Sequence, residues 1–362
     1  MTEFRRIGVL TSGGDAPGMN AAIRAITRKA LEQNVEVMGI IGGYTGLINE
    51  NIVPMTTGSV SNIINHGGTA LYSDRCLEFQ TEAGMQKAIA TCKKFNLDAS
   101  VAIGGDGTFR GAPDLTLHGI PTIGVTGTID NDVTATDYTV GFDTAMNSVV
   151  DAVDKLRDTC ESHARCMIVE VMGRDCGQIA LMTGIATGAI AVVIPEMPFD
   201  ETTAFAKIKK ARELGKRGMV VIVSEGVFVN DENGNKVPYG EVLEKKLEKE
   251  TGVSARFVRL GHMVRGGSPT LRDRLTASRM GAKAVELLLE GKSNLVVLEE
   301  EGKITSMDIV FALTADRMYK NKLKDGDLDR YSEEELAQMK AICAKRRAEI
   351  EELYKLANDI NL

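Results

Sequence analysis

Five short clusters in the sequence combine glycine with aspartate or arginine. One further acidic residue, a glutamate, also follows a short apolar run. They are TSGGDAPG at Thr11–Gly18, GGDGT at Gly104–Thr108, GTIDND at Gly127–Asp132, MGRDCG at Met172–Gly177, GHMVRGG at Gly261–Gly267, and Glu225. Glycine lets backbone N–H groups approach a phosphate, and the N-terminus of a following helix adds positive potential. We therefore interpret the first two clusters as phosphate-binding loops, although a glycine pair after a strand can also be only a tight turn.

Three aspartates in these clusters could take part in chemistry. Asp106 would repel a phosphate directly, so its place inside a phosphate loop makes sense if Mg²⁺ lies between the two groups. Asp130 and Asp132 share one tight turn, where Asp130 could accept a proton from an attacking hydroxyl. The alternative for GTIDND is an Asp-rich turn or helix cap without a catalytic role.

Four arginines lie in or beside the expected strand ends, and together they suggest clamps for phosphate groups. They are Arg165, Arg174, Arg256 and Arg265. A single arginine at such a place is usually a surface residue, but guanidinium pairs bidentately with phosphate oxygens. His262 could hydrogen-bond a sugar or phosphate oxygen, and an ordinary loop histidine is an equally good interpretation.

The elements that must position these residues follow from an alternation of short apolar runs and longer amphipathic runs. The apolar runs predict buried strands at Ile7–Leu10, Val35–Ile41, Ala99–Ile103, Thr122–Val125, Met167–Val171, Ala191–Ile194, Met219–Val223 and Arg256–Leu260. The amphipathic runs predict helices at Met19–Gln33, Glu82–Phe95, Phe142–Arg157, Thr202–Leu214, Tyr239–Thr251 and Leu271–Leu289. This alternation predicts parallel sheets covered by helices on both faces. Most of the chemical clusters directly follow strands, the place where open α/β sheets bind ligands, so they predict one or two clefts.

Composition limits the classes of protein to consider. The 362 residues suggest two domains, and a net charge of −7 argues against a general nucleic-acid binder. The beginning MTEFRRIGVL shows neither a signal peptide nor a membrane-spanning segment, and six scattered cysteines fit a cytoplasmic location. Asn230–Pro238 is expected to be an exposed loop. Ser332–Asn358 is expected to be a helix, because Ser332 and Glu335 form a capping-box pattern.

Taken together, these motifs resemble those of the bacterial ATP-dependent 6-phosphofructokinases from Ile7 to about Leu289. GGDGT alone also occurs in NAD kinases and diacylglycerol kinases, but GGDGT followed by GTIDND, TSGGDAPGMN and GHMVRGGSP is specific. The resemblance implies an α/β fold of two doubly wound three-layer domains with mostly parallel sheets. It implies a nucleotide-binding domain of residues 1–140 plus about 255–305, and a sugar-phosphate-binding domain of residues 141–254 plus a C-terminal segment. Residues 306–362 are expected to form a largely helical C-terminal extension.

The resemblance also implies roles for individual residues in phosphoryl transfer from MgATP to the 1-hydroxyl of fructose 6-phosphate. Asp130 matches the catalytic base, and the residues that share the catalytic site with it are Thr128, Asp132, Arg174 and Arg75. The nucleotide contacts match Gly14, Arg75, Cys76, Gly105, Asp106, Gly107 and Thr108, with Asp106 the carboxylate linked to Mg²⁺. The sugar-phosphate pocket matches Thr128, Ile129, Asp130, Arg165, Met172, Gly173, Arg174, Glu225, Arg256, His262, Met263, Val264 and Arg265. Arg165 and Arg256 correspond to residues that reach in from a neighbouring subunit, so we expect a homotetramer with shared active sites.

The phosphoryl donor is the main choice that the sequence leaves. Relatives that use pyrophosphate typically carry Asp at the position of Gly107 and Lys at the position of Gly127, so this sequence resembles the ATP users. A pyrophosphate-dependent phosphofructokinase is therefore the alternative. An NAD- or diacylglycerol-kinase-like enzyme and a non-catalytic regulatory subunit are weaker alternatives, because they have no need of the GTIDND carboxylates.

The effector site of the family is only partly present. Arg24, Arg28 and Arg157 match it, and Lys216 is a further candidate. Four other positions depart from the family pattern, namely Thr57, Asn62, Ile190 and Leu214. These departures predict weak regulation by ADP or phosphoenolpyruvate, while the oligomer size and the role of the C-terminal extension stay open.

Overall fold

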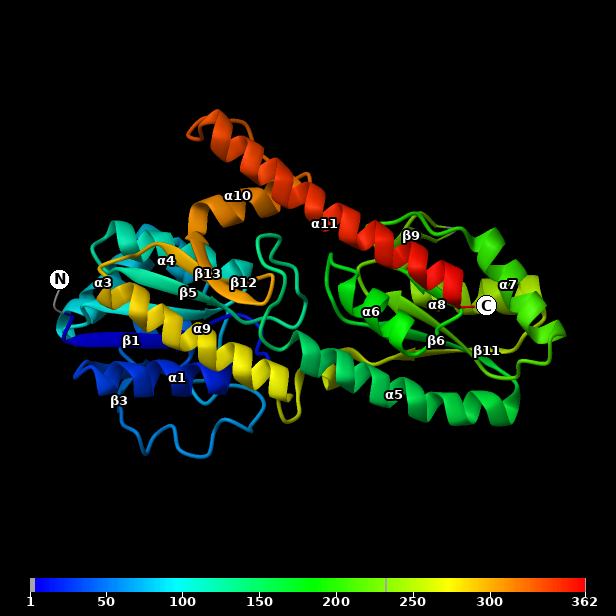
Figure 1. Cartoon of the computed structure of the whole chain (residues 1–362), viewed down its shortest axis with the longest axis horizontal. Helices are drawn as coiled ribbons and strands as arrows, with labels where there is room; N and C mark the ends of the chain where they lie inside the picture. Colours follow the sequence, from blue (N-terminus) through cyan, green and yellow to red (C-terminus); the bar gives the residue numbers. More distant parts are fainter. Residues whose placement is uncertain (1–3, 232, 362) are drawn as a thin grey trace. The chain divides into compact units, whose positions relative to one another are not determined.

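The computed structural model describes residues 4–231 and 233–361, and the chain in it forms two compact units (Figure 1). The first unit comprises the residues up to Ile129, then Val133–Thr144 and Arg265–Cys343. The second comprises Asp130–Asp132, Ala145–Val264 and the residues from Ala344 onward. Residues 255–264 thus lie in the second unit and residues 306–343 in the first, which differs from the boundaries expected from the sequence.

The first unit is built on a seven-stranded sheet with the order β13-β12-β5-β4-β1-β2-β3. Its strands are β1 (Arg6–Thr11), β2 (Glu36–Ile40), β3 (Ile52–Met55), β4 (Ala99–Gly104), β5 (Thr122–Thr126), β12 (Leu295–Glu300) and β13 (Lys303–Asp308). The pairs β2–β3 and β12–β13 are antiparallel, and the other neighbours are parallel. Every residue of the central strand β4 is buried, as expected for a strand covered on both faces.

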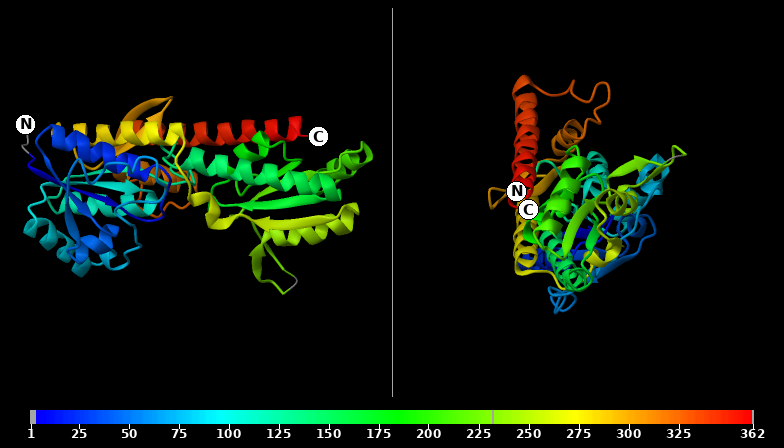
Figure 2. Two further views of the ribbon diagram at one scale, coloured as in Figure 1. Left: turned by 90° about the horizontal axis from the view of Figure 1, so that it is seen from below. Right: turned by 90° about the vertical axis from the view of Figure 1, so that its right-hand side faces the viewer.

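Helices cover both faces of this sheet (Figure 1, Figure 2). On one face α1 (Met19–Glu32) packs along α9 (Leu271–Leu289), so closely that a Cβ at Gly281 would lie 2.8 Å from the Ala22 carbonyl. On the other face lie α2 (Gly43–Ile48), α3 (Glu82–Lys94), α4 (Asp106–Leu117) and α10 (Ile309–Tyr319), with the short 3₁₀ helix η1 (Glu78–Gln80). The first unit is therefore a three-layer α/β structure.

The second unit has a smaller sheet, with the order β11-β6-β8-β7 and all strands parallel. Its strands are β6 (Cys166–Val171), β7 (Ala191–Val193), β8 (Met219–Ser224) and β11 (Ala255–Arg259). Residues Val193, Val221 and Val223 face a core formed with α7 (Glu201–Glu213) and α8 (Tyr239–Thr251). Val192 points to the opposite face, where it packs on Gly184 of α6 (Gln178–Ala186). The second unit is thus also layered on both faces, and α5 (Phe142–His163) enters it from residue 145.

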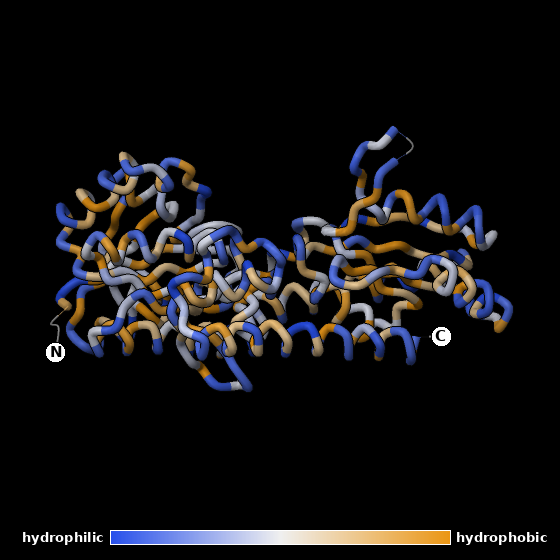
Figure 3. The backbone as a smooth tube through the Cα atoms, turned by 90° about the horizontal axis from the view of Figure 1, so that it is seen from above, coloured by the Kyte–Doolittle hydropathy of each residue, from blue (hydrophilic) through white to orange (hydrophobic). Residues whose placement is uncertain are grey.

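All eight strands and all six helices predicted from the sequence are confirmed, with ends shifted by a few residues. The expected loop at Asn230–Pro238 is wrong as stated, because its ends pair as an antiparallel hairpin of β9 (Phe228–Asn230) and β10 (Lys236–Pro238). Glu232 in this segment lies outside the described residues. The hairpin is hydrophilic toward its tip (Figure 3), which explains why it resembled a loop.

The chain ends in the long helix α11 (Glu333–Ile360), whose predicted capping box is confirmed. Ser332 Oγ accepts a hydrogen bond from the Glu335 N–H at 3.3 Å, and Glu335 Oε2 accepts one from the Ser332 N–H at 2.8 Å. Residues of α11 up to Cys343 belong to the first unit and those from Ala344 to the second. Within the described ranges, each helix is too short or too polar to cross a bilayer.

Candidate active site

The two predicted phosphate loops of the first unit lie side by side at the carboxyl ends of β1 and β4. Thr108 Oγ1 donates a buried hydrogen bond to the Ser12 carbonyl at 2.9 Å, and the Ser12 N–H donates to the Ile103 carbonyl at 3.1 Å. A Cβ at Gly104 would lie only 2.1 Å from Thr108 Oγ1, so this approach requires glycine. The loops open α1 and α4, whose N-cap residues Gly18 and Gly105 make no side-chain cap, and an uncapped helix N-terminus is suited to an anion.

Two further predicted residues of the first unit join these loops. A Cβ at Gly14 would lie 2.9 Å from Arg265 Nη1, which donates to the Asp15 carbonyl at 3.0 Å. Thr128 lies next to Gly105, where an added Cβ would come within 3.5 Å of the Thr128 Cβ. The first unit therefore brings together glycine N–H groups, a threonine hydroxyl and one guanidinium, a set suited to phosphate oxygens.

In the second unit, the carboxylate of Asp130 faces the guanidinium of Arg174. Asp130 Oδ2 lies 3.4 Å from Arg174 Nε, and Asp130 is only 1% exposed. The next residue, Asn131, adopts a left-handed conformation (φ 48°) that asparagine tolerates, which makes the tight turn of GTIDND. A buried carboxylate beside a half-exposed arginine is suited to accept a proton close to a bound anion.

Glu225 organises the MGRDCG turn that carries Arg174. Its Oε1 accepts hydrogen bonds from the N–H groups of Gly173 at 3.2 Å and Arg174 at 3.0 Å. Gly173 has a φ of 145° and its Cβ would lie 2.4 Å from the Cys176 carbonyl, so a side chain is excluded there. Glu225 thus fixes the backbone that points Arg174 toward Asp130.

The predicted sugar-phosphate residues separate into two groups along the smaller sheet. Met172, Gly173, Arg174 and Glu225 follow the carboxyl ends of β6 and β8, and His262, Met263 and Val264 follow β11 in the 3₁₀ helix η2 (Gly261–Arg265). Arg165 and Arg256 instead lie at the amino ends of β6 and β11, where Arg256 pairs with Met167. The six residues of β6 span roughly 20 Å. Arg165 and Arg256 thus lie at the opposite ends of their strands from Arg174, while their expected part in a phosphate clamp stays a prediction.

Comparison with known proteins decides the family. The phosphofructokinase family profile matches residues 6–288 of the chain. The chain belongs to the phosphofructokinase family. It is 54% identical over 294 residues to the ATP-dependent 6-phosphofructokinase of Shouchella clausii, covering 81% of this chain and 89% of the relative. It is 51% identical over 307 residues to the ATP-dependent 6-phosphofructokinase of Bacillus subtilis, covering 85% and 93%.

Solved phosphofructokinases share the fold. A chain of the Saccharomyces cerevisiae phosphofructokinase superposes with a TM-score of 0.83 at 29% identity, covering 98% of this chain and 50% of that one. The pyrophosphate-dependent phosphofructokinase of Marinobacter aquaeolei superposes with a TM-score of 0.72 at 21% identity, covering 84% and 83%. The expected phosphofructokinase fold, with its mostly parallel sheets, is confirmed.

Two residues that the sequence analysis did not single out support the GGDGT loop of this phosphofructokinase. Tyr44 OH donates to the Thr108 carbonyl at 2.7 Å, and the Tyr44 ring stacks on Phe79 with 4.0 Å between centroids. Burial raises the pKa of the Tyr44 hydroxyl, so this hydroxyl stays protonated and able to donate. Tyr44 lies on the six-residue helix α2, too short for an amphipathic pattern to reveal it.

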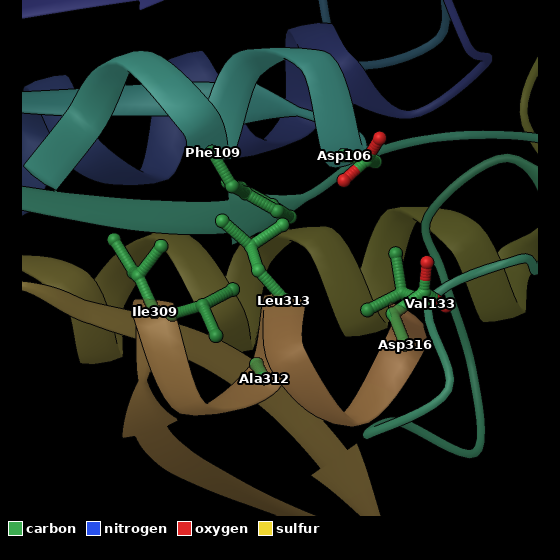
Figure 4. A pocket seen from close by; sticks show the side chains of 8 residues that line it. Asp106, Phe109, Val133, Ile309, Ala312, Leu313 and Asp316 are labelled. Carbon is green, nitrogen blue, oxygen red and sulfur yellow. The ribbon is translucent and has the colours of Figure 1, made fainter. Parts of the chain in front are cut away.

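Asp106 is the carboxylate that could hold a metal ion. It opens α4 beside a small, mainly apolar pocket lined by side chains of α4 and α10, as Figure 4 shows. Arg110 Nη2 lies 2.7 Å from Asp106 Oδ2. Among residues 4–231 and 233–361, no group of three or more metal-binding side chains occurs. Mg²⁺ is often held by one or two carboxylates plus substrate phosphates, so a carboxylate beside the predicted phosphate loops fits a metal that arrives with a nucleotide.

Proposed function

We propose that this phosphofructokinase transfers the γ-phosphoryl group of MgATP to the 1-hydroxyl of fructose 6-phosphate, giving fructose 1,6-bisphosphate and ADP. The observation that carries the proposal is the buried Asp130 carboxylate, which lies 3.4 Å from Arg174 and follows two residues after Thr128, whose side chain lies against Gly105 of the GGDGT loop. The two relatives at 51% and 54% identity, both named ATP-dependent 6-phosphofructokinases, support it.

The first unit provides the nucleotide site in this proposal. The residues we assign to it are Gly14, Arg75, Cys76, Gly105, Asp106, Gly107 and Thr108. The N-terminus of α4 would bind the phosphate chain, and Asp106 would hold Mg²⁺. A metal ion held there would supply neutralisation of the negative charge on the donor phosphates. The open space around Gly107 favours ATP over pyrophosphate as the donor, because no side chain crowds the position of the α-phosphate.

The second unit provides the base and most of the sugar-phosphate pocket. Asp130 accepts the proton of the 1-hydroxyl as that oxygen attacks, and Arg174 holds charge on the moving phosphoryl group. Thr128, Asp132 and Arg75 complete the catalytic set. The remaining sugar-phosphate residues are Ile129, Met172, Gly173, Glu225, His262, Met263, Val264 and Arg265, with Arg165 and Arg256 from a neighbouring subunit. The enzyme thus works chiefly by positioning and charge neutralisation.

A coupled assay on the purified chain tests this function. Fructose 1,6-bisphosphate formation should require fructose 6-phosphate, MgATP and divalent metal, and it should stop when the metal is chelated. Pyrophosphate should replace ATP only poorly. Turnover with pyrophosphate that equals turnover with ATP would identify the alternative enzyme, and no turnover with either donor would reject the proposal.

The active site is proposed to be shared between subunits of a homotetramer. Arg165 and Arg256 lie a strand length from Arg174 within the smaller sheet, so they do not join the Arg174 group of their own subunit. Arg256 makes contacts at its own end of the sheet, with Glu248 Oε1 at 3.3 Å. Both arginines lie away from the Arg174 group of their own subunit, and this position is consistent with a role in the sugar-phosphate pocket of a neighbouring subunit.

Mixing two inactive variants should therefore restore activity. Arg165→Ala alone and Asp130→Asn alone should each be inactive, but a mixed oligomer can contain a site with Asp130 from one subunit and Arg165 from another. We expect activity to return after subunit exchange, at roughly a quarter of the wild-type level if the subunits mix evenly. The measurement is the coupled assay before and after exchange, with exchange followed by native mass spectrometry.

A mixture of Asp130→Asn with Arg174→Ala is the matched control. These two residues lie 3.4 Å apart in one chain, so every site in that mixture keeps one defect and activity should stay absent. Proven exchange without recovery in the Arg165 mixture would contradict the shared site, as would equal recovery in the control.

ADP and phosphoenolpyruvate are expected to have little effect through the family's effector site. Both are anions, and Ile190 is 1% exposed inside the core of the second unit, where it offers no polar group. Leu214 is an exposed apolar residue at the end of α7, and Thr57 adds no charge. An allosteric coupling of about 1–3 kcal/mol needs differential contacts in two states, and about half of the family's effector-site positions have changed here.

The measurement is fructose 6-phosphate saturation at fixed ATP, with and without each effector at millimolar concentration. The fructose 6-phosphate concentration at half-saturation should change by less than about twofold, because a larger change would need an allosteric coupling of the usual size. Arg24→Ala is the control, because Arg24 is one of the cations that match the family site. A several-fold shift that disappears in Arg24→Ala would show a working effector site.

A further inference from the structure

The C-terminal helix α11 contains a buried arginine. Arg346 is 6% exposed, although arginine is rarely buried unless it is paired. Its neighbour on the same helix, Arg347, is exposed. The family profile ends at residue 288, so α11 lies beyond the part of the chain that matches it. The burial of Arg346 therefore needs an explanation from its own surroundings.

The Arg346 guanidinium binds the backbone of the GTIDND turn. Arg346 Nη2 donates a hydrogen bond of 2.7 Å to the carbonyl of Asn131, the residue between Asp130 and Asp132. The side-chain amide of Gln178, with its oxygen turned toward Arg346, accepts from Nη1 at 2.8 Å and from Nε and Nη2 at 3.1 Å. All these residues belong to the second unit.

The charge of Arg346 is balanced by nearby acidic residues. Arg346 Nη1 lies 3.5 Å from Glu349 Oε2, one turn further along α11. Burial raises the pKa of the Glu196 carboxyl, while the Gly177 N–H at 2.8 Å and the charge of Arg346 oppose that rise. Hydrogen bonds that involve a charged donor are stronger than neutral ones, and they gain further in a buried setting. The turn is therefore held by a built polar cluster rather than by a chance surface contact.

We propose that Arg346 is a positioning residue for phosphoryl transfer: it fixes the Asn131 carbonyl and so holds the Asp130 carboxylate at its place beside Arg174. This inference rests on the proposed function, because it takes Asp130 as the base. Arg346 does not touch substrate; it acts through the turn. Misplacement of a reacting group by about 1 Å can lower the rate about 10²-fold. Loss of the hydrogen bond to Asn131, the residue after Asp130, is therefore expected to lower turnover.

Kinetics of three full-length variants test the proposal. Arg346→Met keeps a long side chain without the donors, and it should lower kcat by about tenfold or more while both KM values stay within about twofold. Arg346→Lys should recover part of that loss, because an ammonium can still reach one acceptor but cannot form the guanidinium fork. Arg347→Met is the matched control and should behave as the wild type. Wild-type kcat in Arg346→Met, or a loss that only follows the unfolded fraction seen by circular dichroism, would overturn the proposal.

Hydrogen exchange separates this idea from the proposed function. Amides of the Gly127–Thr134 segment should exchange faster in Arg346→Met than in the wild type and Arg347→Met, without any substrate present. Unchanged exchange there would overturn the positioning role. If the wild type phosphorylates fructose 6-phosphate and Asp130→Asn does not, the proposed function stands, whichever result Arg346 gives. If the wild type is inactive, the proposed function fails, and the exchange result still decides whether Arg346 holds the turn.

Discussion

Replacement of Asp130 by Asn is expected to lower kcat by about 10²–10⁴-fold while sugar-phosphate binding is largely kept. Asparagine preserves the shape of the side chain and its distance from Arg174, 3.4 Å in the wild type, but it cannot accept the proton of the attacking hydroxyl. Arg174 is half-exposed, so water can solvate its charge when the carboxylate is lost. The loss should therefore appear in turnover rather than in folding.

The measurements are steady-state kinetics of the Asp130→Asn variant and fructose 6-phosphate affinity by calorimetry. Asp175→Asn is the matched control, since Asp175 is an exposed acid beside Arg174 that we do not place in the catalytic site. Its kcat should stay close to that of the wild type. Near-normal kcat in Asp130→Asn, with binding intact, would mean that another group serves as the base.

The central strands could be predicted because burial on both faces leaves an unbroken apolar run. Each of the strands β4, β6 and β8 has six residues, and all of them are buried. Each strand therefore appears in the sequence as an apolar run. The edge strands lack this signal: β3 contains Pro54 and has two exposed residues, and β13 is only partly buried. The helix α6 was also missed, because six of its nine residues are buried and no polar face marks a helical period.

The meeting of the TSGGDAPG and GGDGT loops could be predicted, because both follow parallel strands and both depend on glycine at close approaches. Gly104 and Gly14 lie where a side chain would collide with Thr108 or Arg265, so glycine there carries a signal in the sequence itself. Strand direction could have separated Arg165 and Arg256 from Arg174, since both precede or open their strands whereas Arg174 follows one.

Arg346 could not be found from sequence patterns. It lies 215 residues from Asn131 along the chain, and the charged run that contains it looks like a solvated helix face. Long-range contacts of this kind depend on where the C-terminal helix packs, which residue types alone do not specify. Local residue patterns thus indicate which loops lie at the strand ends, whereas long-range contacts such as that of Arg346 with Asn131 need the structure.

Replacement of Gly107 by Asp should raise the KM for ATP roughly ten- to a hundredfold, because a carboxylate would stand beside the α-phosphate and like charges repel in a partly desolvated site. A steric clash should not contribute to this increase in KM. A Cβ at Gly107 meets no atom within 4 Å, and Gly107 is not among the glycines with positive φ. The introduced carboxylate would also lie in the first turn of α4, where a negative charge favours the helix.

Gly107→Asn is the matched control, since asparagine has the same size without the charge. The KM for ATP and for pyrophosphate should be measured for both variants, together with Tm. The ATP KM should rise much more in Gly107→Asp than in Gly107→Asn, while Tm should stay the same or rise in Gly107→Asp because of the helix N-terminus. Because pyrophosphate has no α-phosphate, its KM should change less than that of ATP in Gly107→Asp. Equal ATP KM values in the two variants would show that the nucleotide phosphates do not lie beside Gly107, and the assignment of the GGDGT loop would then be wrong.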